Sequence, residues 1–204
     1  MGLIFDWAAT KLQKKLYVPL KKIKTMADNR KLENKELNRK TLDEFKESSK
    51  IPLVVVLDNI RSLNNIGSVF RTSDALSVEK IFLCGISGTP PNKDIHRTAL
   101  GAEGSVVWEY FEKTTDAIVN LKANGYKVIS LEQTVNSIDL MGYQPKQGMK
   151  YALIFGNELR GVEQEVINIS DECIEIPQFG TKHSFNIAVS VGIVLWDFVT
   201  KISK

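Results

Sequence analysis

The sequence predicts an α/β fold, with a mainly parallel sheet and helices on both of its faces. From Pro52 onward, short apolar runs alternate with stretches in which apolar residues recur at helical spacing. In addition, the runs Val54–Val56, Ile81–Leu83 and Ala152–Phe155 are apolar throughout and do not alternate with polar residues. Unbroken apolar runs are typical of strands that are covered on both faces, as in sheets wound between two layers of helices.

Strands and helices are expected to alternate along this part of the chain. The expected strands are Leu53–Leu57, Lys80–Cys84, Ser105–Tyr110, Tyr126–Leu131, Tyr151–Phe155 and Cys173–Ile176. The expected helices are Ile66–Ala75, Ile95–Leu100, Thr114–Asn124, Val162–Ile169 and Ser184–Ile202.

The last helix is expected to be buried on several sides. Its apolar residues include Val191, Leu195 and Phe198, and the whole run from Phe185 to Phe198 is nearly all apolar or small. Ser184 is the expected N-cap of this helix, because a hydroxyl at that position can accept from the first free backbone N–H groups.

The first fifty residues are expected to form a basic arm, residues 1–50, in front of a folded domain, residues 51–204. The arm holds 13 Lys and Arg against 7 Asp and Glu, whereas the remainder of the chain carries a net charge of −3. Within the arm, Thr41 and Glu44 match a capping box that opens a short helix. Concentrated positive charge fits contact with a polyanion, nucleic acid ahead of membrane, although a merely solvated lysine-rich segment is the alternative.

The composition argues against several classes of protein. No apolar run has membrane-spanning length, and the first residues lack the pattern of a secretory signal. Cys84 and Cys173 are far apart and are expected to be reduced thiols, which suits a cytoplasmic protein. With His96 and His183 as the only histidines, no metal cluster is evident.

In parallel sheets of this kind, ligands bind beyond the carboxyl ends of the strands. Neither GxGxxG nor GxxxxGK[ST] occurs there, so a dinucleotide or P-loop nucleotide site is not expected. Three other stretches fall on this edge of the sheet, and each offers polar groups or backbone for a ligand.

The first stretch is Asn59–Ala75. Asn64 and Asn65 stand where a helix is expected to begin, and exposed amides at a helix start bind anions such as phosphate. Arg71, six positions after Asn65, could fork onto a phosphate through two hydrogen bonds. The alternative is a capped helix whose Arg71 forms an ion pair with Asp74.

The second stretch is Ile154–Val162, with sequence IFGNELRGV, and the third is Cys173–Phe198. In the second, Gly156 lets a ligand approach the backbone, and Glu158 could hold neighbouring loop amides in place. In the third, a strand ends at Pro177, and a loop that contains Gly180 leads into the last helix. Taken singly, these stretches also fit a tight turn and an ordinary strand–loop–helix unit.

Together, the three stretches resemble the motifs of the SpoU (TrmH) branch of the SPOUT RNA methyltransferases. The matching segments are NNIGSVFRTSDA, FGNELRGV and IPQFGTKHSFNIAVSVGI, in that order, within a resemblance that runs from about Leu53 to the C-terminus. Gln178 and Phe185 depart from the family pattern, which commonly has Met and Leu there. The resemblance implies S-adenosylmethionine as cofactor, methylation of a ribose 2′-hydroxyl of tRNA or rRNA, a C-terminal trefoil knot and a homodimer.

The resemblance also implies roles for particular residues. Arg71, Glu158, Ser184 and Asn186 correspond to the catalytic set, with Asn65 in support. Gly156, Ile176 and Phe185 correspond to cofactor contacts, with Ile176 and Phe185 as walls for the adenine or methionine moiety. No metal is implied.

The chemistry of Arg71 is consistent with binding more than with proton removal. An arginine guanidinium holds its proton far above neutral pH, so a neutral guanidine at neutral pH would cost on the order of 7 kcal/mol. We therefore expect Arg71 to bind an RNA phosphate and polarise the hydroxyl, and the sequence leaves the final base open.

Two further expectations concern assembly and alternatives. The homodimer interface is expected to include the last helix, with Val191, Leu195 or Phe198 contributing. The alternative function is a catalytically silent RNA-binding or ribosome-assembly factor on the same fold, and the missing glycine fingerprint disfavours a nucleotide-dependent dehydrogenase.

Overall fold

The computed structural model describes residues 29–202, which fall into two units, 29–40 and 41–202. The basic stretch before residue 29 lies outside the described residues. Within the first unit, a short 3-10 helix spans Asn34–Glu36. The Arg30 guanidinium, 2.6 Å from the Glu36 carboxylate, lowers the pKa of that carboxyl to about 2.

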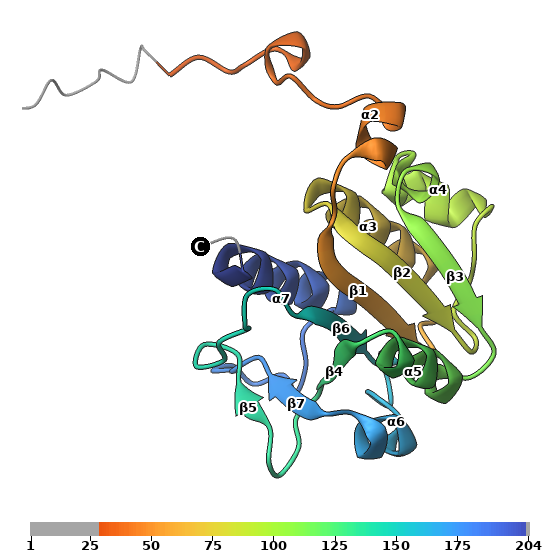
Figure 1. The fold of residues 1–204 in the computed structure, drawn as a ribbon, viewed down its shortest axis with the longest axis vertical. Coiled ribbons are helices and arrows are strands. Elements are labelled where there is room, and N and C mark those ends of the chain that lie inside the picture. Colours follow the sequence, from red (N-terminus) through yellow and green to blue (C-terminus); the bar gives the residue numbers. More distant parts are fainter. Residues whose placement is uncertain (1–28, 203–204) are drawn as a thin grey trace, which may run out of the picture. The chain divides into compact units, whose positions relative to one another are not determined.

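The second unit contains an alternating series of strands and helices (Figure 1). Its elements are α2 (Leu42–Glu47), β1 (Ile51–Asp58), α3 (Leu63–Ala75), β2 (Val78–Cys84), α4 (Lys93–Ala99), a 3-10 turn (Ala102–Gly104), β3 (Val107–Phe111), α5 (Thr114–Ala123), β4 (Tyr126–Leu131), β5 (Ile138–Asp139), β6 (Lys150–Phe155), α6 (Gln164–Ile169), β7 (Glu172–Glu175) and α7 (Ile187–Ile202). The predicted elements are confirmed to within three residues at each end, and β5 is an addition. The capping box of α2 is also confirmed, because Thr41 and Glu44 bond to each other's backbone N–H.

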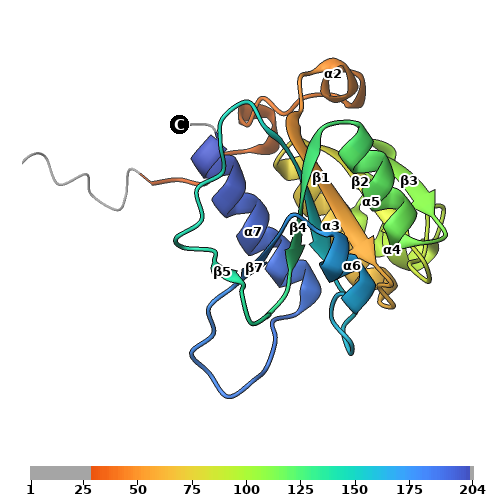
Figure 2. The same ribbon diagram turned by 60° about the horizontal axis from the view of Figure 1, so that its bottom comes forward.

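The strands form one sheet in the order β3-β2-β1-β6-β4-β7-β5, and every pair of neighbours is parallel (Figures 1 and 2). β1 lies in the middle, where Val55 is opposite Ile81 of β2 on one side and Leu153 of β6 on the other. Because all strands run the same way, the loops that follow them gather along one edge of the sheet.

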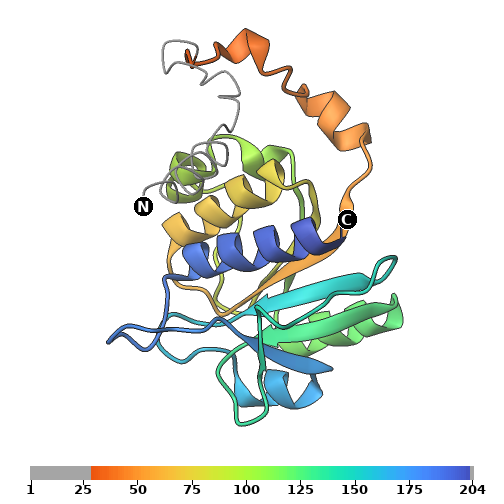
Figure 3. The same cartoon turned by 90° about the vertical axis from the view of Figure 1, so that its left-hand side faces the viewer.

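The two faces of the sheet carry separate hydrophobic cores. Leu53, Val55 and Leu57 of β1 belong to the core beneath α3, α4 and α7, whereas Val54 and Val56 belong to the core beneath α5 and α6. Successive side chains of a strand point to opposite faces, so covering both faces requires the unbroken apolar runs seen in the sequence. Figure 3 shows α3 and α7 side by side above the sheet, and residues of these two helices are in contact.

Helix α7 buries one side in its own subunit and exposes another. Val191, Leu195 and Phe198 are fully buried, and the Phe198 ring packs against Tyr143 and Tyr151, with ring centroids 5.5 Å apart in both pairs. The expectation that these three residues contribute to a dimer interface is therefore wrong, since they already fill the subunit's own core. The exposed apolar residues of this helix are instead Val189, Ile193 and Trp196.

Three further observations bear on the predicted class of protein. Among residues 29–202, no helix is long and apolar enough to cross a membrane. Cys84 is a buried free thiol and Cys173 a half-buried one, as expected for unpaired cysteines. The same described residues contain no group of three or more His, Cys, Asp or Glu placed to hold a metal ion.

Candidate active site

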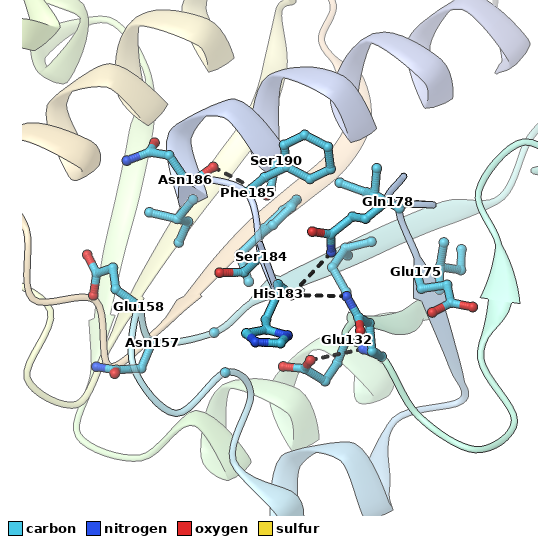
Figure 4. A pocket seen from close by; sticks show the side chains of 18 residues that line it. Glu132, Asn157, Glu158, Glu175, Gln178, His183, Ser184, Phe185, Asn186 and Ser190 are labelled. Carbon is cyan, nitrogen blue, oxygen red and sulfur yellow. Dashed lines mark hydrogen bonds between the residues drawn. The ribbon is translucent and has the colours of Figure 1, made fainter. Parts of the chain in front are cut away.

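A cavity of about 320 Å³ lies at the carboxyl ends of β4, β6 and β7 (Figure 4). Its apolar wall is made by residues at or just beyond those strand ends and by the first residue of α7: Leu131, Phe155, Ile174, Ile176 and Ile187. Carboxylate, amide and hydroxyl groups complete the lining, including Glu132, Glu158, Ser184 and Asn186. A concave site with apolar walls and a few convergent polar groups is the usual form of a small-molecule site, and its volume is at the lower end of the usual range of about 300–1,000 Å³.

The first motif places Asn65 inside helix α3 and not at its cap. The helix begins at Leu63, three residues before the predicted start, because the Ser62 hydroxyl is the N-cap and accepts from the Asn65 backbone N–H at 3.3 Å. The prediction that Asn64 or Asn65 caps this helix is therefore wrong. This leaves the amide of Asn65 free to bond to other loops.

Glu158 of the second motif binds the start of the first motif. Its two carboxylate oxygens accept from the backbone N–H groups of Arg61 and Ser62, both at 3.1 Å. One of these oxygens also accepts from the Asn65 side-chain amide at 3.2 Å. These contacts join residues that are more than ninety positions apart in the sequence.

The donors around Glu158 also change its acidity. Burial by itself raises the pKa of the carboxyl group, but the backbone N–H groups and the Asn65 amide stabilise the charged form more strongly. The pKa of Glu158 is therefore lowered below its ordinary value. At neutral pH this residue is a carboxylate, suited to holding N–H groups and poorly suited to taking up a proton.

Asn186 of the third motif completes the connection. Its side-chain amide donates to Asn65 Oδ1 at 3.2 Å, while its own Oδ1 accepts from the backbone N–H groups of Ala188 at 2.9 Å and Val189 at 3.4 Å. Asn186 thus caps α7, and the predicted cap at Ser184 is wrong. Glu158, Asn65 and Asn186, one from each motif, form a continuous hydrogen-bonded chain beside the cavity.

The loop of the second motif is held closed by Asn157. Its buried side-chain amide donates to the Asn59 carbonyl at 2.6 Å and accepts from the Leu159 N–H at 2.9 Å. Gly156 is required beside it, since a Cβ at that position would lie 2.1 Å from the Gly161 carbonyl carbon. The glycine thus serves close packing of the loop on itself as well as lining the cavity.

The loop of the third motif surrounds the other side of the cavity. The predicted cofactor contacts Gly156, Ile176 and Phe185 all line it. Ser184 of the predicted catalytic set lines it too, close to Phe185 (Figure 4). The His183 carbonyl of this loop accepts from the side chain of Gln133, which follows β4, at 3.3 Å. It also accepts from the side chain of Gln178, in the same loop, at 3.3 Å.

Two predicted site residues do not line the cavity, Asn65 and Arg71. Asn65 is hydrogen-bonded to Glu158 and Asn186, which do line it, whereas Arg71 makes no such contact. It lies on α3 six residues after Asn65, which corresponds to about 9 Å along the helix and a different face. Its side chain is exposed and has no hydrogen bond or ion pair within residues 29–202. The alternative pairing with Asp74 does not form, because that carboxylate accepts instead from the Ser105 hydroxyl.

The sequence analysis did not identify two carboxylates that hold the loops around the site in place. Glu132, half-buried at the end of β4, accepts from Val162 N–H at 3.0 Å and so fixes the end of the second motif. Asp58, fully buried at the end of β1, accepts from the Thr114 hydroxyl at 2.5 Å and the Glu163 N–H at 3.0 Å. The available signal was an acidic residue directly after an apolar strand, where a carboxylate can satisfy the N–H groups of neighbouring loops.

The fold and the cavity define an α/β protein with a small-molecule site at the carboxyl ends of parallel strands. The model of the SpoU rRNA Methylase family matches residues 52–196, and the chain belongs to this family. The resemblance inferred from the three motifs is thereby confirmed.

Similar proteins with described activities cover most of this chain. A tRNA (guanosine(18)-2′-O)-methyltransferase of Aquifex aeolicus is 29% identical over 168 residues, which cover 79% of this chain and 75% of the relative. A 23S rRNA (guanosine-2′-O-)-methyltransferase, RlmB, of Neisseria meningitidis is also 29% identical, over 75% of this chain and 60% of the relative.

Solved structures are similar over the same part of the chain. The TrmH/SpoU tRNA modifying enzyme of A. aeolicus superposes with a TM-score of 0.69 at 25% identity, covering 78% of this chain and 80% of that one. An AdoMet-bound rRNA methyltransferase of Sinorhizobium meliloti gives a TM-score of 0.67 at 27% identity, covering 76% of this chain and 58% of that one.

Proposed function

We propose that this protein is an S-adenosylmethionine-dependent methyltransferase that acts on a ribose 2′-hydroxyl of tRNA or rRNA. The observation that carries the proposal is the hydrogen-bonded chain from Glu158 through Asn65 to Asn186. It joins the three family motifs beside one cavity, in a chain of the SpoU family whose relatives are named as 2′-O-methyltransferases of tRNA and rRNA. The class of reaction predicted from the sequence agrees with these relatives.

The residues present fit the proposed cofactor. The cavity has apolar walls for an aromatic base or an alkyl chain, with Ile176 and Phe185 among them, and polar groups for hydroxyl and amino groups. Among the described residues that line it there are three glutamates and no Lys or Arg, which suits a ligand that carries a cationic sulfur. When bound, S-adenosylmethionine supplies an activated methyl group.

The chain's own residues then have the task of holding the acceptor hydroxyl in position. Glu158, ionised at neutral pH, fixes the Asn65 amide with its N–H toward the carboxylate, so that Oδ1 of Asn65 faces Asn186. Ser184 has no hydrogen bond within the described part of the chain, and its hydroxyl at the cavity is available to a ligand. Positioning of this kind supplies several kcal/mol of the reduction in barrier.

Arg71 has a separate part in this proposal. It has no partner within residues 29–202 and lies outside the cavity lining, as suits a group that binds the substrate's phosphate instead of the cofactor. From that phosphate, the planar guanidinium is proposed to polarise the hydroxyl electrostatically. The group that finally accepts the proton is left open.

The experiment that tests this function combines cofactor binding with mapping of the product. Calorimetry is expected to show binding of S-adenosylmethionine and none of NAD. Incubation with unmodified tRNA and rRNA is expected to give 2′-O-methyl groups at defined nucleotides, and these sites should be missing from a deletion strain. RNA binding without methyl transfer, at saturating cofactor, would favour the catalytically silent alternative.

We also propose that the protein is a homodimer that pairs through the exposed side of α7. Val189, Ile193 and Trp196 follow one another at helical spacing and are 50%, 36% and 63% exposed. An apolar stripe of this length on the surface favours an interaction site, and a second copy offers the same stripe in return. Sedimentation that gives a monomer at micromolar concentration with full activity would rule this out.

The C-terminal trefoil knot is proposed from the arrangement of one long loop. The loop between β4 and β6 pairs with β7 through β5, and it also accepts hydrogen bonds from Lys201 of α7 at the Leu140 and Tyr143 carbonyls. The segment that joins β7 to α7 therefore runs between two contacts with the same loop. Stretching the denatured chain between a residue in β4 and one in α7 is expected to give less than about 3.3–3.6 Å per residue, and full extension would exclude a knot.

The basic arm, residues 1–50, is proposed to bind RNA in front of the methyltransferase domain, residues 51–204. Its charge supports this assignment.

A cytoplasmic location is proposed from the two cysteines, which are both free thiols. Fusing the chain to a fluorescent protein and imaging cells would test the location.

A further inference from the structure

We propose that Arg61, Arg160 and Lys182, here called the rim cations, form a phosphate-binding edge that seats the RNA backbone around the cavity. Each belongs to the loop of a different motif: Arg61 to the first, Arg160 to the second and Lys182 to the third. The inference rests on the proposed function for the identity of the polyanion. It goes beyond that function by assigning substrate-positioning residues outside the motif positions already discussed.

Arg61 has a fixed backbone and a free side chain. Its N–H donates to Glu158 at 3.1 Å, which fixes the residue at the edge of the cavity. Its guanidinium is exposed and has no hydrogen bond or ion pair within residues 29–202. An arginine held in this way can bind a phosphate with little reorganisation of the loop.

Arg160 repeats the arrangement on the neighbouring loop. Arg160 lies two residues after Glu158 in the chain, and its backbone N–H donates to the buried Asn157 side chain at 3.3 Å. Its side chain is likewise exposed and unpartnered in the described part of the molecule. Arg61 donates its N–H to Glu158, and Arg160 follows Glu158 by two residues, so both arginines are anchored by their backbone near the same carboxylate.

The distribution of the arginines in the second unit supports a common purpose. The described residues 41–202 contain four, and Arg97 is the one with partners, Asn64 at 3.0 Å and Asp94 at 3.5 Å. Arg61, Arg71 and Arg160 have no such partners, and all three lie in the first two motifs. A guanidinium without a protein partner keeps its forked N–H groups free for the two hydrogen bonds that a phosphate can accept.

Lys182 extends the edge to the third loop. It is exposed, and it lies next to His183, whose carbonyl is held by the amides of Gln133 and Gln178. The backbone position of this lysine is thus defined although its ammonium group is free within the described residues. The three rim cations thus place positive charge on each of the three motif loops.

The cavity itself carries the opposite charge. Glu132, Glu158 and Glu175 line it, and among the described lining residues there is no Lys or Arg. The positive charge of the rim cations attracts a polyanion to the edge of the cavity. The negative charge of the three glutamates keeps its phosphates out of the interior. The ribose between two bound phosphates can then present its 2′-hydroxyl to the interior. This separation favours RNA phosphates, and not a free anion in the cavity, as the partner of the rim cations.

The test compares two double variants with the same change in charge. Arg61→Gln/Arg160→Gln removes two rim cations, whereas Lys146→Gln/Lys150→Gln removes two exposed cations at the amino end of β6, at the opposite edge of the sheet. Lys182→Gln is measured as a single variant and also in combination with Arg61→Gln/Arg160→Gln. An unmodified tRNA transcript and an rRNA fragment serve as probes, and binding is measured over a range of salt concentrations with calorimetry of S-adenosylmethionine in parallel.

The expected result follows from counterion release. Each lost phosphate contact should flatten the slope of log K against log salt by about 0.7–0.9, which corresponds to about fivefold weaker binding at 0.1 M salt. In the rim double variant, RNA affinity should therefore fall about 25-fold and KM for RNA should rise by the same factor. Cofactor affinity and kcat at saturating RNA should be unchanged. The control pair should lose less than about twofold.

Equal slopes for the rim variant and the control variant would overturn the inference. So would a loss of kcat with unchanged RNA affinity, because that would place the arginines in the chemical step. If the wild-type protein neither binds S-adenosylmethionine nor methylates RNA, yet the rim variant alone weakens RNA binding, the rim assignment stands and the proposed catalytic function falls.

Discussion

The substitution Glu158→Gln tests the hydrogen-bonded chain on which the proposed site depends. The carboxylate accepts from three donors, Arg61 N–H, Ser62 N–H and the Asn65 amide. Glutamine keeps one acceptor oxygen and turns the other into an NH₂ group. At least one of the three donors must then face another donor, and the remaining bonds lose the negative charge.

The size of the effect can be worked from these contacts. A hydrogen bond to a charged group contributes about 1.5–3 kcal/mol to stability and a neutral one about 0.5–1.5 kcal/mol, so the substitution would cost about 3–5 kcal/mol in a buried site. Glu158 is exposed, and water compensates most of that loss. We expect the free energy of unfolding to fall by about 1–2 kcal/mol, or a Tm lower by about 2–8 °C for a chain of this length.

The effect should also depend on pH in a defined direction. Because the pKa of Glu158 is lowered in the folded state, its charge contributes stability above the unfolded value of about 4.3, and that contribution disappears as the pH falls through the folded value. The stability gap between wild type and Glu158→Gln should thus be constant between pH 6 and 8 and shrink below about pH 4.

Chemical denaturation at several pH values, with methyl transfer measured on the same samples, is the assay. Glu165→Gln is the matched control, since Glu165 is exposed on α6 and has no hydrogen bond or ion pair within the described residues. Its stability should change by no more than a few tenths of a kcal/mol. A Glu158→Gln protein as stable as wild type at pH 7, or a gap that persists unchanged at pH 3, would refute the reasoning.

Five other substitutions separate cofactor binding, catalysis, assembly and the packing of the second-motif loop. Phe185→Ala should weaken S-adenosylmethionine binding by about 1–2 kcal/mol through lost apolar contact, which calorimetry measures. Arg71→Ala should abolish methyl transfer at unchanged cofactor affinity, and Arg71→Lys should restore little of it. Wild-type single-turnover rates in Arg71→Ala would contradict the role assigned to Arg71. Trp196→Glu should give monomers by sedimentation if α7 forms the interface, and an unchanged dimer would move the interface elsewhere. Gly156→Ala forces its new Cβ to within 2.1 Å of backbone atoms in the same loop and should cost about 1–3 kcal/mol in thermal unfolding; an unchanged Tm would show that the loop yields freely.

The strands and their order along the chain were predictable because burial on both faces leaves a direct mark on the sequence. β4 was predicted to the residue, and β1 and β6 to within two residues. β5 escaped prediction because two residues, Ile138 and Asp139, cannot display a period, and they form a strand only through their pairing with β7.

The helix starts were harder, since several good N-caps stand close together. Ser62, Asn64 and Asn65 all precede the apolar run of α3, and Ser184 and Asn186 both precede that of α7. Any of these side chains can accept from a free N–H. Which of them does so depends on where the rest of the helix packs, and that is set by contacts with distant strands.

The same limit applies to the division of α7 between core and surface. Its sequence is apolar on nearly every side, so periodicity cannot distinguish the side that meets the sheet from the side that is left exposed. Val191 and Trp196 are equally acceptable in an interface on composition alone. The structure separates them, because only the position of β1, β6 and the long loop shows which side is already covered.

Six of the eight predicted site residues line the cavity, but the bonds that connect the motifs were not predictable, and this difference has a physical consequence. The bond from Glu158 to Asn65 spans 93 positions and the bond from Asn65 to Asn186 spans 121, so no local pattern contains either. Both bonds need the β1–α3, β6–α6 and β7–α7 connections in place at once. Asn186 also caps α7, so the helix that covers the core and the polar chain that organises the cavity begin at the same side chain. Docking of the C-terminal helix and completion of the site should therefore occur together.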